Sequence, residues 1–162
     1  MLDYKYAEYA TEKTVELLAI DSPSGFTSKA AEWVKREFEK LGFYAESTQK
    51  GGVVVDIGGK DENDAVLFEA HVDTLGGMVA EVKSNGRLRL TNIGGMRADN
   101  GETENVRVYT RNGKVIDGVL QLINASVHVN GEYSGTKRSF DTTEVVLDED
   151  VKNAEDTRAL GV

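Results

Sequence analysis

A histidine and an aspartate two positions apart are the residues of this sequence best suited to chemistry. His71-Val72-Asp73 directly follows the apolar segment Ala65–Ala70 and precedes Thr74-Leu75-Gly76-Gly77. Side chains at i and i+2 of a strand lie on the same side, so the Asp73 carboxylate can bond one imidazole nitrogen of His71. The other nitrogen then offers its lone pair to a metal ion. On its own the triplet is more typical of a polar strand end, and a metal ligand with the carboxylate that orients it is the alternative.

Other polar motifs favour structural interpretations. His128, the second of the two histidines, lies in the alternating segment Ser126-Val127-His128-Val129, which predicts a strand. A histidine facing solvent or another subunit is favoured there over a second ligand. Asp61-Glu62-Asn63-Asp64 lacks the ligand spacing of a calcium loop and indicates a solvated turn. Gly58-Gly59 and Gly94-Gly95 are not followed by the strand-turn-helix pattern of phosphate loops, so they are interpreted as loop glycines.

Two helices are predicted before the histidine motif. The first, Asp3 to Ile20, has an apolar face with the charged side chains pointing outward: Tyr6, Ala10, Leu17 and Leu18 against Glu8, Glu12, Lys13 and Glu16. Pro23, the only proline, stops it together with Ser24 and Gly25. The second helix runs from about Ser28 to Leu41, with Thr27 or Ser28 as its cap and Gly42 as its left-handed C-terminal residue.

Strands follow in two groups. Before the motif they are predicted at 43–47, 53–57 and 65–70, the last mostly apolar, as in a strand covered on both faces of an α/β sheet. After it, Asn85-Gly86 and Asn112-Gly113 predict type I′ hairpins that pair 78–84 with 87–92 and 104–110 with 115–118. Further strands are expected at 119–123, 125–129 and 144–147, together a small β barrel, with no helix until one at about 150–160.

Composition limits the class of protein. The 162 residues carry 28 acidic and 19 basic side chains, a formal net charge of -9, which disfavours nucleic-acid and membrane-surface binding. No run of about 18 apolar residues and no leader pattern is present, so a cytoplasmic protein is expected. Because cysteine is absent, any metal must be held by His, Asp or Glu.

The ordered motifs resemble one enzyme family. The segment Ala70 to Val79 resembles the first metal-site motif of the tetrahedral (TET) dinuclear metallo-aminopeptidases, whose members are often named glutamyl or deblocking aminopeptidases, or endoglucanases. Further segments resemble the family in order and spacing along nearly the whole chain: Ser22 to Gly25, Asn85 to Leu88, Ile93 to Gly95, Asp117 to Leu120, Val146 to Asp148 and Ala159 to Val162.

The resemblance implies an α/β fold: the N-terminal part of a phosphorylase/hydrolase-like metallopeptidase domain, followed by an inserted PDZ-like small β-barrel domain. It assigns residues 1–75 to the catalytic domain, 76–149 to the inserted dimerisation domain and 150–162 to a helix leading back. His71 resembles a ligand of one of two divalent metals, zinc or cobalt, and Asp73 the catalytic-site carboxylate that orients it. The family hydrolyses N-terminal residues from peptides, and its dimers assemble into a dodecamer.

The sequence also departs from the family. The bridging aspartate, paired glutamates, further aspartate and second histidine follow the insert in the family, whereas this chain stops at Val162. One ligand cannot hold a metal pair, so we expect the chain alone to be inactive. Thr74, where many members carry glutamate, is interpreted as variation between subgroups. The alternative function is a non-catalytic assembly or regulatory module acting through the β domain; glycoside hydrolysis is disfavoured because no carboxylate pair stands out.

Overall fold

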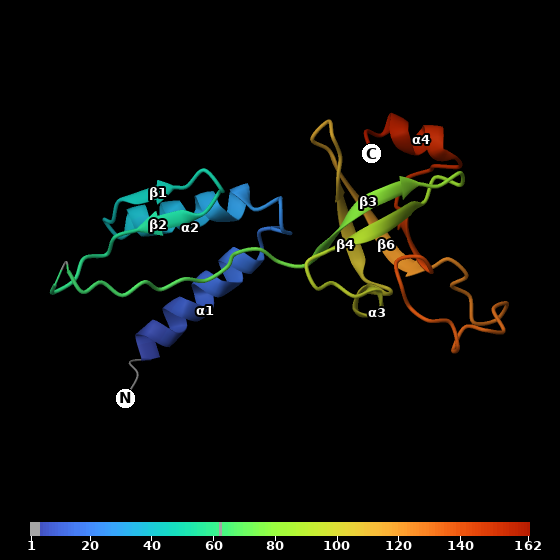
Figure 1. Ribbon diagram of the computed structural model, residues 1–162. Coiled ribbons are helices and arrows are strands. Elements are labelled where there is room, and N and C mark those ends of the chain that lie inside the picture. Colours follow the sequence, from blue (N-terminus) through green and yellow to red (C-terminus); the bar gives the residue numbers. More distant parts are fainter. Residues whose placement is uncertain (1–3, 62) are drawn as a thin grey trace. The chain divides into compact units, whose positions relative to one another are not determined.

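The computed structural model describes residues 4–61 and 63–162 and divides into two compact units, Met1–Leu75 and Gly76–Val162 (Figure 1). No helix within the described ranges is long and apolar enough to cross a membrane. Glu62, part of the acidic turn predicted from sequence, lies outside the described residues.

The first unit consists of two helices and a hairpin. Its elements are α1 (Tyr4–Leu18), α2 (Ser28–Lys40), β1 (Ala45–Ser47) and β2 (Val53–Val55), with β1 antiparallel to β2 and α2 packed against both strands (Figure 1). Ala30 and Ala45 are its buried apolar residues. Both predicted helices and the first two predicted strands are confirmed within a few residues, as is the positive φ of Gly42, 89°. The predicted cap is not formed, because Thr27 makes no side-chain hydrogen bond at the helix N-terminus.

Helix α1 contacts α2 through its charged side, against prediction. Lys13 forms ion pairs with Glu16 at 2.9 Å and with Glu37 of α2 at 3.0 Å, and its ammonium lies 5.9 Å from the Trp33 ring centroid. These carboxylates raise the pKa of Lys13, chiefly through the hydrogen bond to Glu16. The predicted apolar face is not buried: no residue of α1 is buried, Leu17 is half-buried, and Leu18 is exposed.

The prediction of a strand at 65–70 is wrong. Residues 65–73 follow the hairpin without regular structure, and the Phe68 side chain is 86% exposed. A strand requires a hydrogen-bonded neighbour, and no strand of the described residues pairs with this segment. Val66 and Leu67 are likewise exposed, so the apolar composition of this segment is not matched by burial in the first unit.

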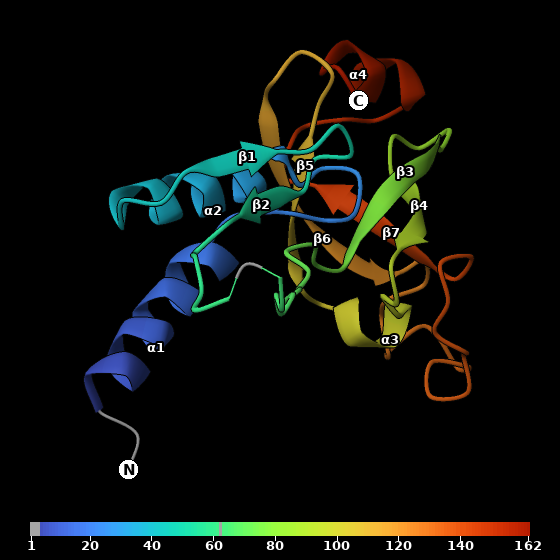
Figure 2. The ribbon, with the colours of Figure 1, turned by 60° about the vertical axis from the view of Figure 1, so that its left-hand side comes forward.

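The second unit is a five-stranded antiparallel sheet. Its strands are β3 (Gly76–Val82), β4 (Leu88–Ile93), β5 (Asn105–Tyr109), β6 (Val115–Leu122) and β7 (Thr143–Leu147), in the order β3-β4-β7-β6-β5 (Figure 2). Alternate residues of β6 face inward, so that Ile116, Leu120 and Leu122 are buried. They build the core together with side chains of β4, β5 and β7, namely Leu88, Leu90, Val108, Val145 and Leu147.

Both predicted hairpins are confirmed, but their turn type differs. β3 pairs with β4 and β5 with β6 around the two Asn-Gly turns. Type I′ needs positive φ at both central residues. Here the Gly86 amide donates to the Lys83 carbonyl and the Gly113 amide to the Thr110 carbonyl, so each glycine follows the two central residues of its turn and has the positive φ, 82°. Each asparagine side chain accepts a hydrogen bond from the backbone two residues later: Oδ1 of Asn85 from the Arg87 amide at 3.1 Å, and Oδ1 of Asn112 from the Lys114 amide at 3.3 Å.

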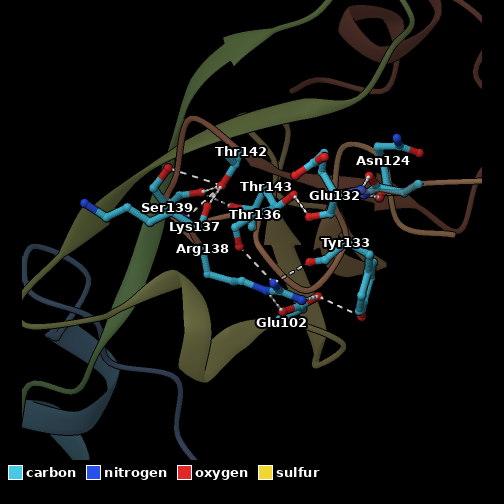
Figure 3. A network of polar contacts seen from close by, with 11 residues as sticks. Glu102, Asn124, Glu132, Tyr133, Thr136, Lys137, Arg138, Ser139, Thr142 and Thr143 are labelled. Carbon is cyan, nitrogen blue, oxygen red and sulfur yellow. Dashed lines mark hydrogen bonds and ion pairs between the residues drawn. The ribbon is translucent and has the colours of Figure 1, made fainter. Parts of the chain in front are cut away.

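The segment that connects β6 to β7 is held by an arginine. The predicted strand 125–129 is wrong, because these residues form turns. Arg138 donates to the Glu102 carboxylate at 2.7 Å and to the carbonyls of Tyr133 and Thr136 at 2.8 Å (Figure 3). Glu102 follows the short helix α3 (Ala98–Gly101), which the sequence pattern did not reveal. The connection is therefore held by side-chain contacts and local backbone turns rather than by strand pairing.

The last helix, α4 (Ala154–Ala159), belongs to the second unit. It begins later than predicted because Asn153 caps it, accepting hydrogen bonds from the amides of Glu155 and Asp156. Thr157 is buried and donates to the Gly86 carbonyl at 2.7 Å, which ties α4 to the β3–β4 turn. Leu160 packs against the core of the sheet.

A buried carboxylate supports a first prediction. Glu144 of β7 is fully buried, and it pairs with Lys83 at 2.5 Å and with Arg87. Replacing both cations by methionine leaves the carboxylate uncompensated. We expect the free energy of unfolding of the second unit to fall by about 3 kcal/mol. This is the low end for a broken buried ion pair, because both cations are partly solvated. Amide hydrogen exchange of Leu120 and Leu122 in the whole chain measures it.

The control is Arg89→Met, which removes the exposed pair between Arg89 and Glu81. Its expected loss is below about 1 kcal/mol. Equal exchange rates in the double variant and this control would show that Glu144 does not depend on its two cations.

Candidate metal-ligand site

The turn after α1 is built by its own backbone. The Phe26 amide donates to the Pro23 carbonyl at 2.7 Å, which closes a β-turn with Ser24 and Gly25 at its centre. Gly25 has a φ of 88°, which only glycine adopts without strain. The fixed φ of proline and the closed turn thus give the Ser24 side chain a defined place.

Ser22 joins this turn to the histidine motif. Ser22 is only 1% exposed, and its hydroxyl donates to the Val72 carbonyl at 2.9 Å. The Thr74 amide donates to the Ser22 carbonyl at 2.8 Å, and Pro23 and Thr74 form a parallel bridge. Segments about 50 residues apart in sequence are thereby held side by side within the first unit.

The structure brings His71 and Asp73 together. Nδ1 of His71 lies 3.2 Å from Oδ1 of Asp73 and 2.9 Å from the Asp73 backbone oxygen. Two acceptors at Nδ1 favour the tautomer in which this nitrogen carries the proton, so that Nε2 keeps its lone pair. The imidazole is 85% exposed and the Asp73 side chain 41%. This is the arrangement that a single neutral metal-ligating histidine requires.

The pKa of Asp73 is lowered by its hydrogen bonds. Its Oδ2 accepts a hydrogen bond from the Ser24 hydroxyl at 2.5 Å. This bond lowers the pKa of Asp73 below its ordinary value, and the nearby His71 lowers it further. The carboxylate therefore remains an acceptor for the imidazole N–H at neutral pH.

The remaining candidates show no metal-site arrangement of their own among the described residues. His128 is exposed in a turn of the second unit, not in a strand. Within residues 4–61 and 63–162, no group of three or more His, Asp or Glu is arranged to hold a metal ion. A cavity of about 250 Å³ in the second unit is lined by Asn124, Asn130, Thr142 and their neighbours, without a histidine.

Sequence reasoning missed the two serines. Ser22 and Ser24 were interpreted only as turn residues, yet their hydroxyls hold the motif in place. The signal available was weak: two hydroxyl residues flank the only proline. Serine is common in turns for purely local reasons, so the sequence alone did not single them out.

Solved structures define the fold class. The TET aminopeptidase from the marine sediment archaeon Thaumarchaeota archaeon SCGC AB-539-E09 matches 97% of this chain and 43% of its own, with a TM-score of 0.80 at 20% identity. The TET1 peptidase of Pyrococcus horikoshii matches 93% of this chain and 43% of its own, with a TM-score of 0.73 at 24% identity. The chain therefore has the mixed α/β fold of the corresponding part of these structures.

Sequence comparison identifies the family. The chain belongs to the M42 glutamyl aminopeptidase family, whose model matches residues 51–162. The protein YhfE of Bacillus subtilis (strain 168) is 34% identical over 147 residues, which are 91% of this chain and 42% of YhfE. The glutamyl aminopeptidase of Lactococcus lactis subsp. cremoris (strain MG1363) is 30% identical over 106 residues, 65% of this chain and 30% of that protein. The chain thus spans less than half the length of these relatives.

The Ser22 contact gives a second prediction. Ser22→Ala removes the donor to the Val72 carbonyl, which costs about 1 kcal/mol locally and speeds exchange of the Thr74 amide about fivefold. The matched control is Ser28→Ala, a change at an exposed helix residue in the same unit. Thr74 exchange equal in the two variants would show that the hydroxyl does not hold the segments together.

The Ser24 contact predicts a pH effect. Because the folded-state pKa of Asp73 is lowered, its ionised form stabilises the folded unit above the ordinary pKa. That contribution is lost as the pH falls through the folded-state pKa. ¹³C NMR titration of the carboxylate should give a pKa below the ordinary one, and Ser24→Ala should raise it. An unchanged midpoint in the variant would contradict the assigned cause.

Proposed function

We propose that this chain is the N-terminal portion of a metal-dependent aminopeptidase that hydrolyses N-terminal residues from peptides. The observation that carries the proposal is the His71–Asp73 pair, with Nδ1 held at 3.2 Å from the carboxylate and the ring exposed. Membership of the M42 glutamyl aminopeptidase family supports a peptidase.

The chain's own donor set fits one position of a metal site. His71 would be the ligand through Nε2, and Asp73 would fix the ring and its tautomer without binding the metal. The chemistry that a divalent metal pair, zinc or cobalt, would supply when bound is Lewis acidity and activation of a water for peptide hydrolysis. Since the described residues contain no further ligand cluster, the other ligands and a proton-shuttling glutamate would come from outside this chain. Alone, the chain would be inactive.

The two units receive different roles in this proposal. Residues 1–75 would form part of the catalytic domain, and residues 76–149 an inserted PDZ-like dimerisation domain. Residues 150–162 would form a helix that leads back to the catalytic domain. Related structures support an assembly: Pyrococcus horikoshii TET1 forms a dodecamer and can assemble into a tetrahedron or a large octahedral shell. We extend homo-oligomerisation to this protein on that basis. Cytoplasmic localisation stays a prediction.

A non-catalytic assembly or regulatory module is the second candidate function. The second unit favours it, because its five-stranded sheet has a core of its own and its order ends on β3 and β5. An end strand can pair with another chain. Sedimentation that shows only monomers, and no association with a longer family member, would count against this alternative.

The central test uses a polypeptide in which this chain is continued by the rest of the family domain. His71→Ala should abolish tight binding of one metal per site and lower kcat/KM to background, while Asp73→Asn should weaken metal binding about 10- to 100-fold. His128→Ala is the matched control and should change neither quantity. Full activity of His71→Ala on peptides with a free N-terminus would exclude the proposed ligand role.

A further inference from the structure

Ser24 is connected to His71 through the Asp73 carboxylate. The two oxygens of Asp73 have different partners: Oδ2 accepts from the Ser24 hydroxyl at 2.5 Å, and Oδ1 lies 3.2 Å from His71 Nδ1. We propose that Ser24 is a positioning residue that fixes the Asp73 carboxylate so that His71 presents Nε2 as a metal donor. This inference rests on the proposed function, because it assigns Ser24 to that same site.

The Asp73 carboxylate is fixed because each of its two oxygens has its own partner. An aspartate with one hydrogen-bonding partner still rotates about its terminal torsion, which is broad and roughly two-fold. A second partner on the other oxygen removes that freedom. Because the His71 and Asp73 side chains are 85% and 41% exposed, water competes for every contact here, so one hydrogen bond alone holds the ring weakly.

Ser24 is itself held in place. The Phe26 amide closes the turn around Ser24. Ser22, two residues earlier, is hydrogen-bonded to Val72 and Thr74. The serine hydroxyl and the carboxylate therefore approach from two segments 49 residues apart whose backbones are already bonded to each other. Such a supporting shell restricts the geometry of a site more than local sequence does.

The order of the contacts excludes a nucleophilic role for Ser24. A serine nucleophile gives its proton to the histidine, and the acid orients that histidine from the far side. Here the hydroxyl donates to the carboxylate, and the recorded partners of His71 Nδ1 are both atoms of Asp73. A positioning role follows from the same three residues.

The test measures the tautomer of His71 in the 162-residue chain. Long-range ¹H–¹⁵N NMR at about pH 8, where free imidazole is neutral, distinguishes Nδ1–H from Nε2–H. In the unmodified chain we expect mainly Nδ1–H. Ser24→Ala should shift the ratio toward Nε2–H about two- to tenfold, the worth of one hydrogen bond, with the Asp73 backbone oxygen retaining part of the preference. Ser24→Thr should restore the original ratio.

Two controls keep the result specific. Ser28→Ala makes the same chemical change at an exposed position of α2 and should leave the ratio unchanged. If Ser24→Ala fails to fold, the comparison of Ser24→Thr with Ser24→Val takes its place, since these side chains have nearly the same shape and differ in the hydroxyl. Equal ratios within the folded pair would overturn the proposal.

A metal titration separates this inference from the proposed function. Co²⁺ alone, added to the chain at millimolar concentration, should broaden the His71 ring signals before those of His128, an exposed histidine in the second unit. Equal broadening would count against His71 as the ligand and hence against the proposed function. The effect of Ser24 on the tautomer would stand or fall independently of that outcome.

Discussion

The hydrogen bonds between the Ser22 turn and the Val72–Thr74 segment are the constraint on which the candidate site depends. A backbone amide and one buried hydroxyl, each donating to a backbone carbonyl, join two stretches that lack regular structure of their own. Because Val72 lies between His71 and Asp73, restraining it also restrains both neighbours. The pair is exposed, so its order comes from this backbone attachment rather than from burial.

The rest of the first unit has little apolar burial with which to stabilise that attachment. No residue of α1 is buried, and α1 meets α2 through Lys13 and its carboxylates. Val66, Leu67 and Phe68 are exposed beside the motif. In the TET aminopeptidases that this fold matches, the chain corresponds to about two-fifths of the molecule. Our proposal that further chain completes the site also gives these apolar side chains a surface to pack against.

The second unit has the opposite character. Alternation along β6 places one face in a continuous core, while Glu144 pairs with Gln121 on the opposite face of the sheet, where Lys83 and Arg87 neutralise it. Thr157 and Leu160 of the terminal segment add to the same body. A unit with its own core and hydrogen-bonded attachments is suited to an assembly role, which our proposal assigns to it.

Local pattern determined much of this protein in advance. The 3.6-residue period and Pro23 gave the two N-terminal helices, and the Asn-Gly pairs gave both hairpins, because these signals act between residues close in sequence. The proximity of His71 and Asp73 was likewise expected from their spacing, although the structure places them in an irregular segment rather than at the end of a strand.

Tertiary structure alone decided the contacts between distant segments. Ser24 meets Asp73 across 49 residues, and a serine beside a proline has the same local signature whether or not its hydroxyl has such a partner. The absence of a strand at 65–70 has the same origin, because strand formation depends on neighbours that no local pattern supplies. The sequence by itself determined the two N-terminal helices, the hairpins and the motif; the three-dimensional fold determined what holds the motif, because those hydrogen bonds are non-local.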